Sequence, residues 1–329
     1  MSRYAMAKQY EMFKVRVTGV EQATPQIKRF TLARADGAAL PAFSGGSHVI
    51  VQMQSACGSQ FSNAYSLMSD PRQLHSYQIG VRLEEQSKGG SAFMHQQVEV
   101  GSELTISTPN NLFALDPSAG RHVLIAGGIG ITPFLAQLHE LEGGDTPYEL
   151  HYAFRAPEHG AFQGDLEQGP HAGNTRFYID SLERKLDLAA LCAGLADDAH
   201  LYVCGPKPLI DAVIATAATA GIAEPRVHWE QFAAAAPAAG SAFTVVLARS
   251  GTELEVEEGM TILQAIEKSK AAKVECLCRE GVCGTCETAI LEGEAEHFDQ
   301  YLSDEEKASQ QTMMLCVSRA RTARLVLDL

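Results

Sequence analysis

The stretch VECLCREGVCGTCETAI, residues 274–290, contains four of the eight cysteines of the chain: Cys276, Cys278, Cys283 and Cys286. Four residues separate Cys278 from Cys283, two separate Cys283 from Cys286, and Cys316 follows after 29 more. This spacing fits the pattern C-x4-C-x2-C…C of plant-type [2Fe–2S] sites. We therefore expect Cys278, Cys283, Cys286 and Cys316 to be the metal ligands of a [2Fe–2S] cluster.

The residues between these cysteines suit the same chemistry. Three thiolates must surround one small anionic cluster, and Gly281 and Gly284 allow the tight turn that this requires, with backbone N–H groups directed at the sulfur atoms. Structural zinc is the less favoured alternative, because it normally uses two closely spaced pairs of ligands. Cys276 does not fit the spacing, so we predict that it is not a ligand.

A third domain is expected around this stretch. AAAAPAAGSA, residues 233–242, is small, uncharged and interrupted by Pro and Gly, which is typical of a linker. MTILQAIEKSKA, residues 260–271, predicts an amphipathic helix before the cysteine loop, as in an α+β plant-type ferredoxin (β-grasp) domain over 243–329. That segment has 16 acidic and 9 basic residues. The acidic excess indicates either a solvated face or a surface for docking a basic electron acceptor.

The middle of the chain, residues 113–232, has a different pattern. Continuous apolar runs that end near glycine predict buried parallel strands, and amphipathic stretches between them predict helices, so we expect an α/β parallel sheet. In IAGGIGITP, residues 125–133, a strand leads through glycines into a helix, with Thr132 as the predicted cap and Pro133 at its first position. YVCGPKPLIDAV, residues 202–213, repeats the arrangement. Both turns would lie at the carboxyl ends of strands, where nucleotides bind; a plain strand–helix turn is the alternative.

The first stretch, residues 1–112, alternates apolar and polar residues in short runs separated by Gly, Pro and Ser. This pattern predicts an all-β barrel or sandwich. SNAYSLMSDP, residues 62–71, and SKGGSAF, residues 87–93, interrupt the strands with polar, glycine-rich sequence that could hold a flat cofactor and its phosphate. Taken alone, both segments are better explained as turns.

Composition narrows the possible classes of function. With 329 residues, two or three domains are expected. The formal net charge of −14 argues against binding to nucleic acid or to a membrane surface. No apolar run approaches the roughly 18 residues of a membrane span, and the first residues lack a secretory apolar core. We therefore expect a cytoplasmic protein, in which clustered cysteines bind metal more often than they form disulfides.

The two predicted sites require a third cofactor between them. A nicotinamide nucleotide gives up two electrons together as hydride, whereas a [2Fe–2S] cluster accepts one. A flavin is the cofactor that connects the two processes, and the first domain is the place where it would bind.

The chain resembles the phthalate dioxygenase reductase family, in which a Greek-key flavin barrel, a nicotinamide domain and a plant-type ferredoxin follow one another. The resemblance covers nearly the whole chain and depends on AYSL, GGS, TPNNLF, GGIGITP, CGP and CREGVCGTC…C. It implies FMN, NADH or NADPH as electron donor, and an oxygenase subunit with a Rieske centre as partner. The implied flavin residues are Asn63, Tyr65, Ser66, Arg82, Gly89, Gly90, Ser91 and Phe113. The implied nucleotide residues are Gly128, Gly130, Thr132, Pro133, Gly205 and Pro206. Cys204, Glu230 and Phe232 would lie beside the reacting nicotinamide and flavin.

One position departs from the family pattern. The flavin motif is usually Arg-x-Tyr-Ser, and its arginine meets the flavin phosphate, but here Asn63 takes that place. Arg82 or Lys88 could supply the missing cation. Specificity for NADPH needs cations around its 2′-phosphate, and Arg155 is the only one well placed in the sequence. We therefore expect NADH as the electron donor.

Two alternative functions remain open at this point. One is a reductase for an oxygenase or demethylase acting on a betaine or an aromatic acid, and the other is a redox-sensing iron–sulfur flavoprotein.

Overall fold

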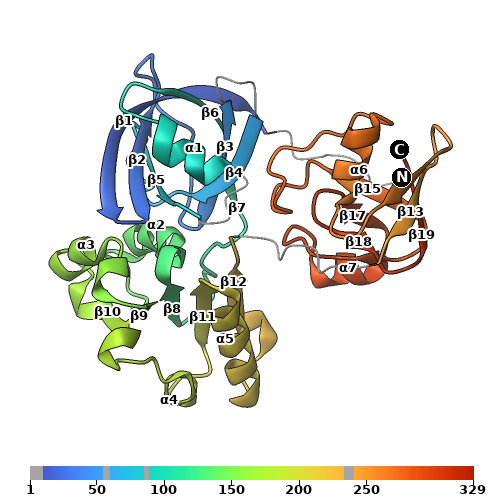
Figure 1. Cartoon of the computed structure of the whole chain (residues 1–329). Coiled ribbons are helices and arrows are strands. Elements are labelled where there is room, and N and C mark those ends of the chain that lie inside the picture. Colours follow the sequence, from blue (N-terminus) through green and yellow to red (C-terminus); the bar gives the residue numbers. More distant parts are fainter. Residues whose placement is uncertain (1–9, 55–59, 85–88, 233–240) are drawn as a thin grey trace. The chain divides into compact units, whose positions relative to one another are not determined.

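Figure 1 shows the computed structural model of the chain, which describes residues 10–54, 60–84, 89–232 and 241–329. Internal contacts divide the chain into two compact units: residues 12–61 with 65–232 make up one, and the other consists mainly of 233–329. Lys88 and most of the predicted linker lie outside the described residues.

The first part of the larger unit is a barrel. Its strands are β1 (Met12–Thr24), β2 (Ile27–Ala33), β3 (Ser47–Gln54), β4 (Gln60–Ser66), β5 (Tyr77–Arg82), β6 (Glu103–Ser107) and β7 (Asn110–Asn111). They follow the order β4-β3-β6-β1-β2-β5, with β7 on β3. An antiparallel bridge between Leu67, just after β4, and Ile79 of β5 joins the two ends of this order and closes the sheet.

Apolar side chains fill the inside of this barrel. Alternate residues of its strands, such as Val15, Val17, Phe30 and Leu32, are fully buried, as the period of two predicts. Helix α1 (Gly90–Gln97) contributes the buried Met94 to the same core. The prediction of an all-β first domain is confirmed, and of the two predicted forms the barrel is observed.

The second part of the larger unit is a parallel sheet between two layers of helices. The sheet has the order β10-β9-β8-β11-β12, and every neighbouring pair is parallel. Its strands are β8 (Arg121–Gly127), β9 (Tyr148–Phe154), β10 (Thr175–Ile179), β11 (Ala199–Cys204) and β12 (Val227–Glu230). Its helices are α2 (Thr132–Leu141), α3 (Gln163–Gln168), α4 (Leu188–Ala193) and α5 (Lys207–Thr219).

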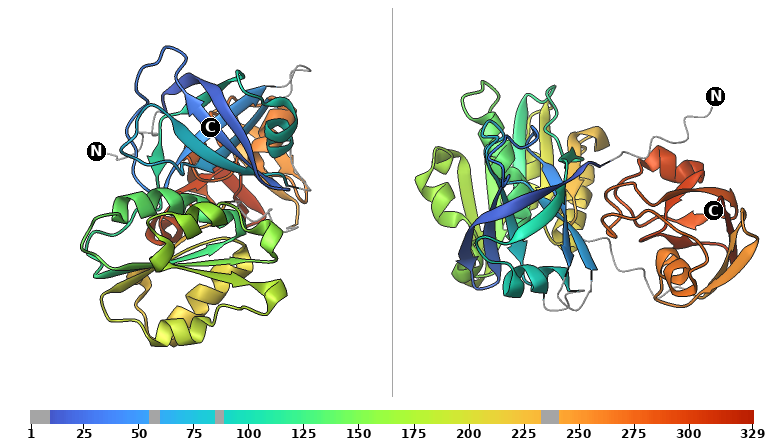
Figure 2. Two further views of the ribbon diagram at one scale, coloured as in Figure 1. Left: turned by 90° about the vertical axis from the view of Figure 1, so that its left-hand side faces the viewer. Right: turned by 90° about the horizontal axis from the view of Figure 1, so that it is seen from above.

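The helices of this sheet cover both of its faces (Figure 2, left). Phe134 of α2 and Leu166 of α3 belong to the core on one face, and Cys192 of α4 and Val213 of α5 to the core on the other. Cys192 itself is 4% exposed. The predicted parallel α/β sheet is confirmed.

The start of α2 differs from the prediction in one detail. Thr132 is the first residue of the helix and not its cap, because a 3-10 turn, Gly128–Ile131, precedes it. Its hydroxyl donates a hydrogen bond to the Ile129 carbonyl, 3.0 Å away. Pro133 is in the first turn but is the second residue of the helix, one place later than predicted. The link between β8 and α2 is therefore a 3-10 turn that leads directly into the helix. The pattern of apolar residues in the sequence could not indicate this turn.

The smaller unit has a mixed sheet of order β14-β13-β19-β15-β17 and a short pair, β16-β18. The strands are β13 (Phe243–Leu247), β14 (Thr252–Val256), β15 (Glu287–Glu292), β16 (Ala295–Glu296), β17 (Thr312–Met314), β18 (Arg319–Ala320) and β19 (Arg324–Leu327). The helices are α6 (Ile262–Ser269) and α7 (Asp304–Ser309). Helix α6 is the predicted amphipathic helix: Thr261 and Gln264 form a capping box at its start, and Ile262 and Ile266 are buried in the core.

Within the described ranges, none of the helices combines the length and the apolar character needed to span a bilayer.

Candidate functional site

The four cysteines predicted as ligands meet at one place in the smaller unit. Each is buried, with 0% to 5% of its surface exposed. The Cys278 thiol is within hydrogen-bonding reach of the thiols of Cys283 and Cys316, and Cys316 is also within reach of Cys286. Four thiols this close together are a donor set for an iron–sulfur cluster, so the residues present fit that group.

The loop that carries three of these cysteines has the predicted left-handed turns. Gly281 and Gly284 have φ angles of 73° and 77°, and a side chain at either position would collide with neighbours, for Gly284 with the ring of Tyr301. The Glu280 N–H donates to the Cys278 sulfur at 3.4 Å. The thiols of Cys283 and Cys316, together with this contact, hold the pKa of Cys278 well below its usual value. The contact with Cys278 in turn raises the pKa of Cys283, and contacts with Cys276 and Cys278 raise the pKa of Cys316.

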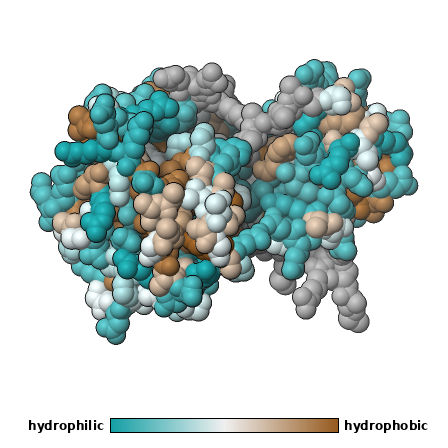
Figure 3. Space-filling model, turned by 90° about the horizontal axis from the view of Figure 1, so that it is seen from below, coloured by the Kyte–Doolittle hydropathy of each residue, from teal (hydrophilic) through white to brown (hydrophobic). Residues whose placement is uncertain are grey.

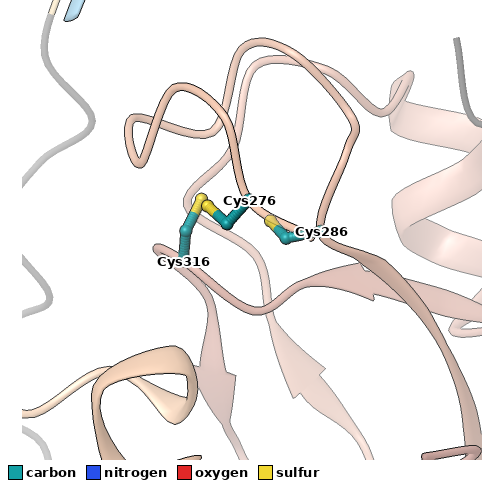
Figure 4. Close-up of side chains that lie close together, drawn as sticks. All are labelled: Cys276, Cys286 and Cys316. Atoms are coloured by element: carbon teal, nitrogen blue, oxygen red, sulfur yellow. The ribbon is translucent and has the colours of Figure 1, made fainter. Parts of the chain in front are cut away.

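Cys276 reaches the same place. The sulfur atoms of Cys276, Cys286 and Cys316 lie within 4.8 Å of one another, and Figure 4 shows the three side chains pointing together. Cys276 is only partly buried, unlike the four predicted ligands. The geometry therefore offers five thiols for four ligand positions, and the prediction that Cys276 is not a ligand still needs a test.

Thr285 is a member of this site that the cysteine spacing did not reveal. Its Oγ1 lies 3.1 Å from the sulfur of Cys283 and accepts the N–H of Leu277 at 2.9 Å. The only signal in the sequence was a hydroxyl residue between two predicted ligands. Thr285 thereby connects the two arms of the loop.

The two glycine turns of the larger unit pack directly against each other. A Cβ on Gly130 would lie 2.2 Å from the carbonyl oxygen of Cys204, and one on Gly205 would lie 3.0 Å from the Cα of Gly127. Gly128, in the first of these turns, has a φ of 54°, and nothing lies within 4 Å of a Cβ added there. The turns follow β8 and β11, which are neighbours in the sheet, so they form one backbone surface at the carboxyl ends of the strands. Such a surface fits the phosphates of a dinucleotide.

Several predicted nucleotide residues serve the packing of these turns. Thr132 is 2% exposed, and its Cγ2 would be 2.9 Å from a Cβ on Gly80 of the barrel strand β5. Pro133 is buried beside it at the start of α2, and Pro206 precedes α5. These contacts fix where the turns lie, whereas contact with a nucleotide stays a prediction for all three.

Cys204 and Glu230 are opposite each other on the adjacent strands β11 and β12. Cys204 is fully buried, and burial together with the Glu230 carboxyl raises the pKa of its thiol well above the usual value. Cys204 is therefore a neutral thiol inside the core, and its location beside the reacting nicotinamide stays a prediction. Phe232 is partly buried against the same core.

Glu230 has an unusual environment. Burial raises the pKa of its carboxyl to about 8, and its Oε2 has no hydrogen-bond partner in the part of the chain that the structure describes. An acid that stays protonated at neutral pH, next to the glycine turns, is typical of a functional position. The buried acid is consistent with the predicted location of Glu230 beside the nicotinamide, and that location stays a prediction.

Replacing Glu230 by glutamine should change how stability depends on pH. Because its pKa is raised in the folded protein, the neutral carboxyl stabilises the fold at low pH, and this contribution is lost as pH rises through about 8. Relative to the wild type, Glu230→Gln should gain on the order of 2 kcal/mol between pH 6 and pH 9, at about 1.4 kcal/mol per pKa unit. Urea unfolding at both values measures this. Glu224→Gln, at an exposed position before β12, is the control, and equal behaviour of both variants would contradict the assignment.

The residues predicted for the flavin lie on three elements of the barrel. Asn63, Tyr65 and Ser66 are on β4, Arg82 ends β5, and Gly89, Gly90 and Ser91 are at the start of α1. The Ser91 hydroxyl accepts the N–H of Glu84 at 3.2 Å, which connects the end of β5 to α1. Arg82 is 3.7 Å from the Glu84 carboxylate.

Phe113 takes a different place from these barrel residues. Phe113 is 3% exposed, and its ring packs edge-on against Phe134 and Tyr202. Its carbonyl accepts a hydrogen bond from Gln137 at 2.6 Å. Phe113 is therefore part of the core that joins the barrel to the parallel sheet, and a contact with flavin stays a prediction.

Comparisons with known proteins agree with this combination of sites. A family model described as "2Fe-2S iron-sulfur cluster binding domain" matches residues 245–321. The carnitine monooxygenase reductase subunit of Escherichia coli (strain K12) is 60% identical over 97% of this chain and 99% of its own length. The subunit of the same name from Acinetobacter baumannii is 58% identical over 98% of this chain and 100% of its own. A solved structure of phthalate dioxygenase reductase, described as modular for electron transfer from pyridine nucleotides to [2Fe–2S], is 33% identical, with a TM-score of 0.75 over 97% of this chain and 98% of its own.

The chain belongs to the phthalate dioxygenase reductase family. It is an oxidoreductase of the reductase-component class, with a flavin-binding barrel, an NAD(P)H-binding domain and a [2Fe–2S] ferredoxin domain. Within this family it is similar to carnitine monooxygenase reductase subunits. The segments GGSHVIVQM, SNAYSL, STPNNLFAL and AAKVECLCREGVCGTCETAILEGEA already indicate this narrower relationship.

Proposed function

We propose that this chain is the reductase subunit of a two-component oxygenase that cleaves carnitine into trimethylamine and malic semialdehyde. Electrons from NADH pass by way of FMN and the [2Fe–2S] cluster to a Rieske centre on the oxygenase subunit. The observation that carries the proposal is the buried four-cysteine site, in a chain 60% identical from end to end to a carnitine monooxygenase reductase subunit.

Each part of the chain has a separate task in this proposal. Residues 1–112 bind the flavin, 113–232 the nicotinamide nucleotide and 243–329 the cluster, with 233–242 as linker. When bound, the flavin converts the two-electron chemistry of the nucleotide into one-electron transfers. Tyr65 and Ser66 face its ring system, and Gly89, Gly90 and Ser91 surround its phosphate. We place the whole system in the cytoplasm, where cluster thiols stay reduced.

NADH is the proposed donor. A 2′-phosphate would need cations beyond the end of β9, and Arg155, which follows that strand, is exposed. Since an exposed cation is well solvated, it contributes little to selecting a phosphate. Gly128, Gly130 and Gly205 supply backbone contacts that do not distinguish the two nucleotides.

The acidic ferredoxin domain provides a surface for the partner. Glu253, Glu255, Glu257 and Glu258 follow closely on one another, and Asp304, Glu305 and Glu306 form the first turn of α7. In the view of Figure 3 this domain is mostly coloured for hydrophilic residues. We propose that a basic face of the oxygenase docks there, because complementary charge accelerates association.

Reconstitution with candidate oxygenase subunits tests the proposal. With a carnitine oxygenase, we expect NADH oxidation that depends on carnitine and yields one trimethylamine for each carnitine consumed. Because docking is electrostatic, raising the salt concentration from 50 to 500 mM should slow the coupled reaction.

Two other outcomes of these experiments would contradict the proposal. Turnover with a demethylase acting on a betaine or an aromatic acid, and none with a carnitine oxygenase, would refute the substrate but retain the reductase. A protein containing flavin and iron that fails to reduce cytochrome c with NADH would refute the reductase itself. A redox-sensing role would then be the better explanation.

A further inference from the structure

Three histidines gather at one edge of the parallel sheet. His122, His200 and His228 are each the second residue of their strands, β8, β11 and β12, and these strands are neighbours. His122 is directly opposite His200 in the register. Because the strands are parallel, second residues lie at their amino ends, on the opposite edge from the glycine turns. This cluster is therefore separate from the nucleotide site.

An aspartate completes the group. Asp116, in the segment before β8, has its Oδ2 3.8 Å from Nδ1 of His200, and that nitrogen is 3.0 Å from Nε2 of His228. The three ligand atoms lie within 4.8 Å of one another. Ligand atoms around a tetrahedral zinc ion are roughly 3.3 Å apart, given bonds of about 2.0–2.2 Å. Small side-chain rotations would bring these three atoms onto one ion.

Neighbouring groups already hold these ligands in place. Oδ1 of Asp116 accepts two hydrogen bonds from Ser118, at 2.8 Å from its N–H and 2.6 Å from its hydroxyl, and these bonds hold the carboxylate whose Oδ2 lies near His200. The Tyr202 hydroxyl accepts the Asp116 N–H at 2.8 Å, and its ring stacks on His228 at 4.5 Å. Such outer contacts, which fix the orientation of ligands, are typical of metal sites.

The imidazoles of this group lie close together. The rings of His200 and His228 stack, with their centroids 5.2 Å apart. His122 is 4% exposed, and its Nδ1 has no hydrogen-bond partner among the residues that the structure describes. At least one imidazole nitrogen of this group of histidines is therefore not used in a hydrogen bond among the described residues.

We propose that Asp116, His200 and His228 form a binding site for one divalent transition-metal ion, with zinc as the best fit and water as the fourth ligand. Two imidazoles and one carboxylate match the ligand preferences of zinc. The Asp116 side chain is 35% exposed, which gives the ion and the water a route from solvent. The ion fixes β12, the edge strand that carries Glu230, to β11 and to the segment before β8. This site has no part in the proposed electron transfer.

Zinc binding to the protein loaded with flavin and cluster tests this proposal. Equilibrium dialysis with Zn²⁺ should give one bound ion per chain in the wild type. X-ray absorption at the zinc edge should show nitrogen and oxygen neighbours near 2.0–2.2 Å and no sulfur near 2.3 Å, because sulfur would mean that zinc sits at the cluster cysteines. Iron and sulfide analysis confirms that the cluster is intact.

Variants then assign the ligands. His228→Gln and Asp116→Asn should each weaken zinc binding at least tenfold, since changes even outside the ligand sphere cost about 10–100-fold. Asp116→Asn keeps the size of its side chain, so it serves if His228→Gln fails to fold. His75→Gln, at an exposed histidine before β5, should bind zinc like the wild type. The proposal is overturned by a wild type that binds no zinc, by sulfur neighbours, or by full binding in both site variants.

Discussion

Serine in place of Cys286 is expected to prevent assembly of the [2Fe–2S] cluster and to lower NADH-dependent reduction of cytochrome c by at least about 100-fold. Cys286 is 2% exposed and lies among three other predicted ligand thiols, and a serine hydroxyl is a far weaker ligand for iron than a thiolate. Ferricyanide reduction needs only the nucleotide and flavin sites of the larger unit, so it should remain. Visible absorbance, iron content and the two assays together measure the effect.

Cys276→Ser is the matched comparison, because Cys276 comes from the same loop and its sulfur lies within 4.8 Å of those of Cys286 and Cys316. If it is not a ligand, iron content and cytochrome c reduction should stay near wild-type values. Cys192→Ser, in the core of the larger unit, controls for the loss of a buried thiol. Loss of the cluster in Cys276→Ser with retention in Cys286→Ser would reverse the ligand assignment.

The cluster site could be predicted from the sequence because most of its residues lie close together in the chain. Three of the four expected ligands lie within nine residues, and the glycines between them already imply the left-handed turns observed at Gly281 and Gly284. Cys276 shows the limit of such reasoning. The cysteine spacing excludes Cys276 as a ligand. Its thiol, two residues before Cys278, is nevertheless within 4.8 Å of the sulfur atoms of Cys286 and Cys316.

The parts that the sequence could not predict depend on strand register. His122, His200 and His228 are separated by 77 and 27 residues, so no motif connects them, and only the parallel alignment of β8, β11 and β12 brings them together. The same alignment places Glu230 opposite Cys204, and burial there changes a carboxylate into a neutral acid. The sequence of one strand does not specify which residues of a neighbouring strand will lie opposite its own residues.

Alanine at Gly130 should have the largest effect on use of the nucleotide. Its Cβ would lie 2.2 Å from the carbonyl oxygen and 2.4 Å from the carbonyl carbon of Cys204, and these are backbone atoms that cannot rotate away. The turn after β8 must then separate from the turn after β11, which disturbs the surface proposed for the phosphates. We expect the KM for NADH to rise at least about tenfold and stability to fall by about 1–3 kcal/mol, the usual cost of overpacking. Ferricyanide kinetics and thermal unfolding measure both.

Gly164→Ala separates this effect from the general consequence of adding a methyl group. Gly164 is in helix α3 of the same unit, and nothing lies within 4 Å of the added Cβ. Because alanine favours a helix by up to about 1 kcal/mol over glycine, this variant should keep its NADH kinetics and lose no stability. The cluster spectrum should be unchanged in both variants, since the cysteines belong to the other compact unit. Wild-type KM for NADH in Gly130→Ala would mean that the contact between the two turns does not shape the nucleotide site.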